Sequence, residues 1–252
     1  TLDVRANQNL QADVTADTRL DAAVSSGAVT SLTTAATGVT SDSNIYEGTL
    51  TGVYNQQTGP GLIYGHSHIE APDAEVGDVT ASAQAIGVSQ GFGVSYSVVG
   101  ARVNQTNQAD VVADGGGTYG YVEGAATFAG TATGTNVTSS GVGGSGERYI
   151  IDQDNQAALT QASQFTAHGA AYLSTTSATA SGNNISASNE GGLLDVTSAQ
   201  ENQAYVRAQS QGSAYQFGSA ASIAYGVGNS FMAGNFGAET LIDAVQLNEG
   251  GG

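Results

Sequence analysis

Apolar and polar residues alternate along much of this chain, and small residues occupy many of the apolar positions. Residues 79–85 read VTASAQA, and residues 94–98 continue the alternation as VSYSV. A two-residue period is typical of a half-buried β-strand, because successive side chains of a strand point to opposite faces. The pattern therefore predicts strands rather than helices.

The alternating segments recur with a period of 46 to 49 residues. Glutamines recur in one column and glycines in a second, and each glycine precedes the next glutamine by 18 or 19 residues. The glutamine column consists of Gln8, Gln56, Gln105, Gln153, Gln200 and Gln246, and the glycine column of Gly38, Gly87, Gly134, Gly182 and Gly228. A constant period of this size indicates one supersecondary unit stacked on copies of itself. We predict an all-β fold, a β-solenoid resembling a parallel β-helix, with about five ~47-residue repeats in a single array over residues 1–252.

The sequences around the two columns resemble each other, as in VNQTNQADVV (103–112) and TASGNNISAS (179–188). We interpret each period as two coils of roughly two dozen residues, which predicts an array about 50 Å long at ~4.8 Å per coil. Glycine at a corner allows a positive φ or a close backbone approach, and stacked Asn and Gln side chains can form amide ladders. The alternative, a disordered Gly- and Ser-rich chain, does not account for the constant spacing.

The second repeat is irregular and contains both prolines, Pro60 and Pro72. Proline cannot donate a hydrogen bond to a neighbouring strand. We therefore expect an irregular insertion or loop at about residues 57–80.

The two ends of the chain share one phase of the repeat. Residues 1–14 align without a gap on residues 193–206, and residues 243–252 reach the glutamine column again. Neither end reads as a distinct capping unit, and an uncapped coil exposes backbone groups that can pair with another chain. We expect copies of the chain to stack head-to-tail into a homopolymer; the alternative is that flanking sequence supplies caps.

The composition narrows the partners and the compartment. The chain has 22 acidic residues against five arginines, a net charge of −17, and no lysine or cysteine. Such a chain repels phosphate backbones and anionic membrane surfaces, so we expect no nucleic acid partner. No apolar run is long enough to span a bilayer. The residue mix favours an extracellular protein of the bacterial cell surface.

Two small groups of side chains are weak candidates for metal ligands. His66 and His68 fall on one face of a strand, with Glu70 two residues further on, and could bind a transition metal. A second group has the oxygen ligands that Ca²⁺ prefers and consists of Asp73, Glu75 and Asp78. Exposed polar residues of a loop are the favoured interpretation of both groups, so we predict no cofactor, with Ca²⁺ as the alternative. His168 is expected to be a packing or surface residue.

The motifs for catalysis are weak. A Ser/His/Asp constellation cannot be assembled from the spacing of the residues, and nothing singles out a pair of carboxylates for glycoside hydrolysis. The aromatic residues of GTYGYVEG (117–124) and GSAYQFG (212–218) could stack on one another or on sugar rings. We predict that the protein is not an enzyme. A polysaccharide-processing β-helix enzyme and a carbohydrate-binding module remain the alternatives.

Four segments carry a resemblance to a known family: GHSHIEAP (65–72), TASAQAIGVSQG (80–91), QAYVRAQ (203–209) and GVGNSFMAGNFG (226–237). Through them the chain resembles the holdfast-anchoring protein D family of stalked alphaproteobacteria. The resemblance implies a secreted surface protein that polymerises and ties an adhesive polysaccharide to the cell envelope, with other surface anchor proteins as further partners. It brings no catalytic residues. The expected function is a structural subunit of an extracellular adhesive fibre or polysaccharide anchor in cell adhesion and biofilm formation.

Overall fold

The structure is a computed structural model that describes residues 1–236 and 239–250. In this part of the chain it contains twelve strands and no helix. The strands are β1 (Leu2–Leu10), β2 (Val14–Asp21), β3 (Ser25–Tyr46), β4 (Thr49–Thr58), β5 (Leu62–Ser95), β6 (Val98–Asn107), β7 (Asp110–Val142), β8 (Gly146–Asn155), β9 (Leu159–Glu190), β10 (Leu194–Asn202), β11 (Tyr205–Phe236) and β12 (Thr240–Asn248).

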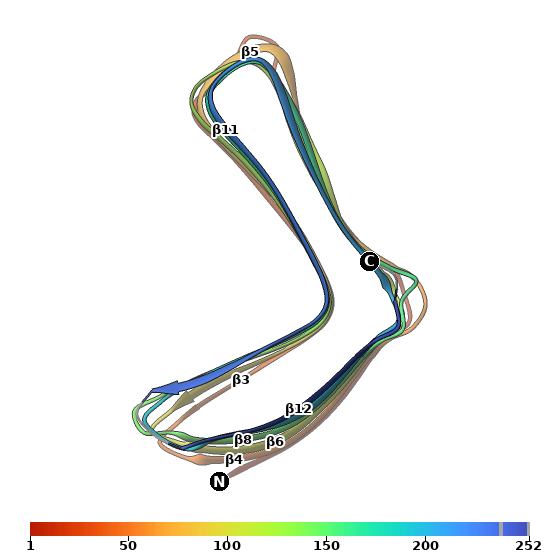
Figure 1. Ribbon diagram of the computed structural model, residues 1–252, viewed down its shortest axis with the longest axis vertical. Coiled ribbons are helices and arrows are strands. Elements are labelled where there is room, and N and C mark those ends of the chain that lie inside the picture. Colours follow the sequence, from red (N-terminus) through yellow and green to blue (C-terminus); the bar gives the residue numbers. More distant parts are fainter. Residues whose placement is uncertain (237–238, 251–252) are drawn as a thin grey trace.

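The strands form two parallel sheets in which each strand pairs with its equivalent in the next repeat (Figure 1). Sheet A contains the short strands in the order β1-β4-β6-β8-β10-β12. Sheet B contains the long strands in the order β11-β9-β7-β5, and both β2 and β3 pair with the outer edge of β5. The prediction of an all-β parallel solenoid is confirmed.

The prediction of two coils in each period is wrong. Gln56 pairs with Gln105, and Gln105 with Gln153, so residues one full period apart are neighbours in the sheet. Each period therefore forms one large coil. The six strands of sheet A are separated by five steps of ~4.8 Å, so the stack is about 24 Å long and not about 50 Å.

Each coil has an L-shaped outline with two arms, and each arm consists of two facing layers (Figure 1). We call the arm that contains sheet A the short arm; residues 87–107 form one example. The long arm is formed by the remaining residues of the coil, which run outward and back again, as in residues 108–134. The two arms meet at the elbow. In a short arm the chain runs outward from its glycine, turns, and returns to the residue that faces the glycine at the elbow, as Asn107 faces Gly87. The glutamine lies two residues before this facing residue, so the constant glycine-to-glutamine spacing reflects the constant length of the short arm.

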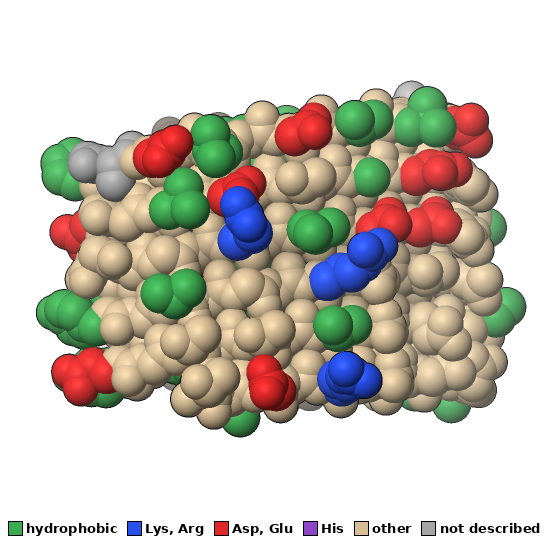
Figure 2. Space-filling view, turned by 90° about the horizontal axis from the view of Figure 1, so that it is seen from below, with side chains coloured by type: hydrophobic (Ala, Val, Ile, Leu, Met, Phe, Trp, Pro, Cys, Tyr) green, Lys and Arg blue, Asp and Glu red, His purple; other side chains and the backbone are tan. Residues whose placement is uncertain are grey.

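The outer face of sheet A carries mixed charges. Figure 2, which views the molecule from this side, shows acidic and basic side chains spread among polar and isolated hydrophobic ones. Arg5, Arg102 and Arg148 are exposed on β1, β6 and β8. Arg148 Nε lies 2.7 Å from Asp195 Oδ2 on the neighbouring strand. The strong negative charge of the chain is thus partly balanced on this face.

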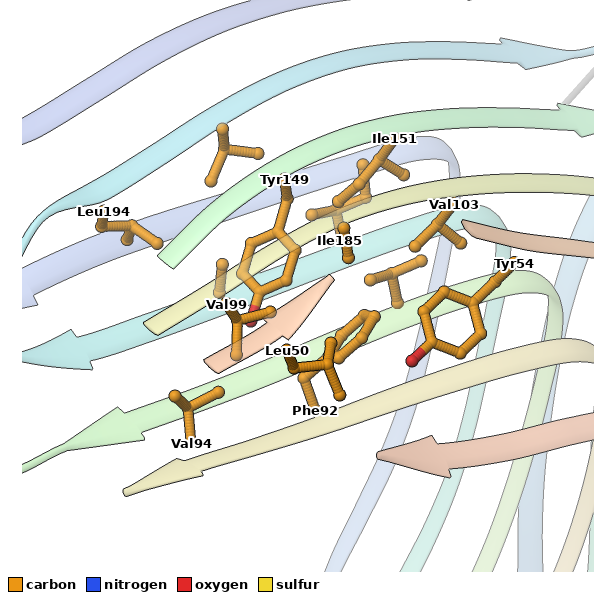
Figure 3. Packing of buried hydrophobic residues seen from close by; sticks show 14 residues of the cluster. Leu50, Tyr54, Phe92, Val94, Val99, Val103, Tyr149, Ile151, Ile185 and Leu194 are labelled. Atoms are coloured by element: carbon orange, nitrogen blue, oxygen red, sulfur yellow. The ribbon is translucent and has the colours of Figure 1, made fainter. Parts of the chain in front are cut away.

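The interior of the short arm contains an apolar cluster (Figure 3). Phe92 lies between Tyr54 and Tyr149, at ring-centre distances of 5.4 and 5.0 Å. Leu50 and Leu194, from two strands of sheet A, are both almost completely buried beside them. The long arm has a second apolar cluster near its tip and an alanine-rich one near the elbow, where small side chains let the layers approach closely.

Residues 57–80 do not form a loop that stands off the solenoid. β4 continues to Thr58, and β5 begins at Leu62 and pairs with both neighbouring repeats. Pro60 lies in the short turn between these strands. Pro72 lies at the tip of the long arm, where the pairing with β7 shifts register between Ala71 and Glu75, so its missing N–H removes no bond from this pairing.

The alternation at residues 94–98 also ends earlier than the pattern predicts. Val94 is buried, but Tyr96 has a φ of 50° and forms the turn at the end of the short arm. The earlier run, residues 79–85, keeps its inward side chains buried throughout.

Candidate functional site

The glutamine column forms a continuous hydrogen-bonded ladder along the stack. Gln56 Nε2 donates to Gln8 Oε1 at 2.8 Å, and each later glutamine donates to the one before it, up to Gln246 Nε2 and Gln200 Oε1 at 2.6 Å. The same Nε2 atoms of the first five glutamines also donate to backbone carbonyls of the opposing layer. The ladder therefore ties consecutive coils together and ties the two layers of each short arm to each other.

A second ladder runs along the elbow in the opposite direction. Asn107 Nδ2 donates to Asn155 Oδ1 at 2.8 Å, Asn155 to Asn202 at 3.0 Å, and Asn202 to Asn248 at 2.7 Å. Thr58 Oγ1 donates to Asn107 Oδ1 at 2.7 Å at the start of this ladder. Three of these residues are completely buried, so the bonds are made where unpaired amides would be costly.

The glycine column faces the asparagine ladder. An ideal Cβ on Gly87 would lie 2.5 Å from Asn107 Oδ1, and one on Gly38 would lie 2.6 Å from the Gly87 carbonyl oxygen. No glycine of the column has a positive φ. Of the two reasons that favour glycine at a corner, close approach is the one that applies here.

The two ends of the stack present unpaired strand edges among the described residues. β12 pairs with β10 alone, and β11 pairs with β9 alone; at the other end β1 pairs only with β4. Ile242 occupies the inward column of Tyr149 and Val196 but is 50% exposed. Such edges and half-covered inward side chains can take up a further strand.

His66 and His68 lie side by side on the outer face of β5, as the alternation predicts. Their rings stack at 5.9 Å with an interplanar angle of 8°. His66 Nδ1 lies 2.9 Å from Asp17 Oδ1, and His68 Nε2 lies 3.1 Å from Glu70 Oε2. Each ring thus has a carboxylate partner of its own.

The acidic candidates lie at the tip of the long arm and have structural contacts. Asp78 Oδ1 accepts a hydrogen bond from the Ala125 backbone N–H at 2.8 Å, and so bridges two coils. The Glu75 N–H donates to the Val24 carbonyl. In the described part of the chain, no group of three or more His, Asp or Glu side chains is placed to hold a metal ion.

A small hollow on the outer face of the long arm was not expected from the sequence. We call it the ring notch; it is lined by His68, Gly117, Thr118, Phe165, Gln211 and Ser213. His68, Gly116 and Phe165 are paired neighbours on three consecutive strands, so no side chain separates the two rings. Phe165 is 42% exposed, so one face of its ring is open to solvent. The run of three glycines at 115–117 beside aromatic columns is the sequence signal for it.

Comparison with known protein families gives a match over the whole chain. A family model described as holdfast attachment protein D matches residues 1–252, the whole chain. Searches of curated proteins and of solved structures found no match. Among the described residues there is no helix of the length and apolar character that a membrane span needs.

Proposed function

The chain belongs to the holdfast attachment protein D family, and from this premise we propose that it is a structural subunit of an extracellular adhesive fibre or polysaccharide anchor at the bacterial cell surface. Its copies stack head-to-tail, and the stack links the adhesive polysaccharide and other surface anchor proteins to the cell. The role is mechanical and requires no catalysis. Release of new reducing ends from a polysaccharide by the purified protein would contradict this non-enzymatic role.

The observation that carries the stacking proposal is the long unpaired edge of β11. Within residues 1–236 and 239–250, the 32 residues of β11 have strand partners on one side only. The corresponding edge at the other end belongs to β2 and β3. These strands pair with β5 in parallel, and their partners lie about one repeat away in the sequence, as in the pairing of β11 with β9. Parallel strands of equal phase on the two end faces suit a heterologous contact that repeats without closing.

The joint has to accommodate sheets of different size. Sheet A has six strands along the stack, whereas sheet B has five levels because β2 and β3 share one. Pairing β1 of a second copy with β12 would leave the long-arm edges two levels apart, about 10 Å. Pairing β2 and β3 of the second copy with β11 of the first would bring β1 of the second copy to the same level as β12 of the first.

We place the joint at the long arm, where β11 of the first copy pairs with β2 and β3 of the second. β12 of the first copy then takes the place of the second copy's β1 beside the second copy's β4. This exchange substitutes one nine-residue strand for another, with Gln246 over Gln56 in place of Gln8. It also gains the pairing of β11 with β2 and β3, which contain 8 and 22 residues. The gain in backbone hydrogen bonds therefore comes from the long arm.

Deletion of the competing strands tests the joint. Removing residues 1–10 or residues 240–252 gives sheets of equal size, so each variant should form filaments faster than the full 252-residue chain in light scattering and negative-stain images. Removing both segments restores a mismatch and should slow assembly again. If no variant associates at high concentration, stacking is wrong. If all four assemble at one rate, stacking holds but the exchange is wrong.

The ring notch supports a second candidate function, carbohydrate binding. An exposed phenylalanine beside glycine residues, with hydroxyl and amide groups at the rim, matches the way apolar sugar faces and hydroxyls are recognised. Phe165→Ala should weaken retention of the protein on immobilised holdfast polysaccharide. Tyr172→Ala, at a tyrosine 71% exposed outside the notch, is the matched control. Equal retention of both variants and the unsubstituted chain would exclude the notch.

A further inference from the structure

Glu147 is a carboxyl group in an apolar column. It is the second residue of β8 and pairs with Val99 on β6 and Leu194 on β10, both of which are buried in the short-arm core. Its side chain is itself only 1% exposed. An isolated carboxylate in such surroundings would be strongly unfavourable, so the question is which form of the group the site stabilises.

The carboxyl group fills space that Gly141 leaves empty. An ideal Cβ on Gly141 would overlap Glu147 Oε1 and also Asn189 Oδ1, so both oxygens lie in the volume of one missing methyl group. Gly141 and Asn189 are paired neighbours on β7 and β9. The absence of a side chain at Gly141 is what makes room for the acidic side chain of Glu147.

The two carboxyl oxygens have different surroundings. Glu147 Oε2 accepts hydrogen bonds from Ser139 Oγ and from the Tyr149 hydroxyl, the latter at 2.7 Å. Glu147 Oε1 has no hydrogen-bond partner among the described residues, although it is completely buried. Oε2 therefore accepts two hydrogen bonds, whereas Oε1 is buried without a partner among the described residues.

The Asn189 amide faces Glu147 with its oxygen. Asn189 Nδ2 donates to the Ser145 carbonyl at 2.7 Å and to the Leu193 carbonyl at 3.3 Å, which fixes the orientation of the amide. Asn189 Oδ1 is then buried and without a donor among the described residues. Two buried acceptor oxygens that face the same small space repel each other, and a hydrogen atom between them turns this repulsion into a hydrogen bond.

We propose that Glu147 is a protonated carboxylic acid in the folded protein at neutral pH, and that its Oε1–H donates to Asn189 Oδ1. Each chain takes up one proton at this site when it folds above the pH at which a free glutamate ionises. This inference is independent of the stacking proposal, since it concerns the interior of a single chain.

The surrounding groups agree with a neutral side chain. Tyr149, on the same strand, is the titratable group in contact with Glu147. Its uncharged hydroxyl donates a hydrogen bond to Glu147 Oε2. The contacting groups of β7 and β9 are Ser139 and Asn189, neither of which titrates. Burial raises the pKa of Glu147 above its ordinary value of 4.5, against the opposing effect of its two hydrogen bonds.

The sign of the pH dependence follows from this direction. Between the ordinary pKa and the raised pKa of the folded state, the folded chain binds a proton that the unfolded chain has released. Stability contributed by Glu147 is therefore full at acidic pH and is lost as the pH rises through this interval. The unfolding equilibrium constant should increase about tenfold for each unit by which the pKa is raised.

Glu147→Gln tests the assignment, because a glutamine amide can donate to Asn189 Oδ1 while its carbonyl accepts from Ser139 and Tyr149. At pH 8 the variant should be as stable as the unsubstituted chain or more stable, and its advantage should vanish near pH 4.5. Infrared spectra at pH 7 should contain a protonated carboxyl stretch that the variant lacks. Glu190→Gln, at an exposed neighbour, is the matched control and should retain that band.

Two outcomes would overturn the proposal. Absence of the protonated carboxyl band at pH 7, with equal loss of stability in Glu147→Gln at every pH, would show an ionised side chain. If added Na⁺ or Ca²⁺ stabilises the unsubstituted chain at pH 7 and the substitution abolishes this effect, a cation rather than a proton lies between the two oxygens.

Discussion

Gly134 and Asn155 meet across the elbow so closely that an ideal Cβ on the glycine would lie 2.5 Å from Asn155 Nδ2. The same asparagine accepts a hydrogen bond from Asn107 at 2.8 Å and donates one to Asn202 at 3.0 Å. The glycine column and the amide ladder are therefore two sides of one packing arrangement. Any side chain on the glycine displaces an amide that links three coils.

Gly134→Ala should lower the free energy of unfolding by about 2–4 kcal/mol, because the added methyl group overlaps backbone and strains a buried amide network. Urea unfolding followed by circular dichroism measures the change. Gly100→Ala is the control, since a Cβ added there meets no atom within 4 Å. Similar losses in the two variants would contradict a specific role for the elbow.

Gln153→Leu should cost about 3 kcal/mol. The side chain is completely buried, donates to Gln105 Oε1 at 2.9 Å and to the Asn184 carbonyl at 3.0 Å, and accepts from Gln200 at 2.8 Å. Leucine would leave these buried partners unpaired, which costs about 1–3 kcal/mol each before relaxation.

The matched control for the ladder is Gln108→Leu. Gln108 and Gln156 form the same kind of amide pair at 2.9 Å on the exposed surface, where water replaces a lost partner. This variant should unfold within about 0.5 kcal/mol of the unsubstituted chain. A loss as large as that of Gln153→Leu would mean that ladder burial is not the source of the stability.

The repeat, the strands and the parallel stacking follow from the sequence, because a constant spacing between equivalent residues and a two-residue alternation can both be read directly from it. The number of coils in a period does not. The sequences around the glycine and glutamine columns resemble each other, but the columns lie on facing walls of the same short arm, with Gln56 donating across the arm to the Ser89 carbonyl. Spacing alone cannot distinguish residues that face each other from residues that stack.

The candidate residues show the same division. His66 and His68 share a strand face, as the alternation predicts, but their carboxylate neighbours Asp17 and Glu70 depend on tertiary pairing. The buried position of Glu147 depends on Gly141 in a facing strand. A signal for it does exist: the repeat places this acid at the position of Leu50, Val99 and Leu194.

Glu47→Gly should stabilise the fold by about 1 kcal/mol, because Glu47 has a φ of 48° and left-handed backbone is unfavourable for residues with a Cβ. Its N–H donates to the Ser95 carbonyl at 3.0 Å, a bond that glycine retains. Thermal unfolding measures the gain. Thr51→Gly, in an extended exposed position of β4, should instead lose about 1 kcal/mol, and an equal effect in both variants would contradict the backbone argument.

His168 should make the fold sensitive to acid. It is 5% exposed, lies 6.4 Å from the Tyr119 ring and 6.0 Å from the Phe128 ring, and neither ring nitrogen has a partner among the described residues. Burial lowers its pKa from 6.5 to about 4. Between these values the unfolded chain binds a proton and the folded chain does not, so stability falls as the pH falls, by up to about 3 kcal/mol.

His168→Phe should remove this acid-dependent loss, because phenylalanine occupies similar space without a group to protonate. Urea midpoints at pH 7 and pH 4 measure it, with His66→Phe, at a half-buried position on the outer face of β5, as the control. Comparing each variant with the unsubstituted chain at the same pH cancels the carboxyl titrations common to both, including the opposite effect expected of Glu147. If His168→Phe loses as much stability between these pH values as the unsubstituted chain, the buried imidazole is not the acid-sensitive group.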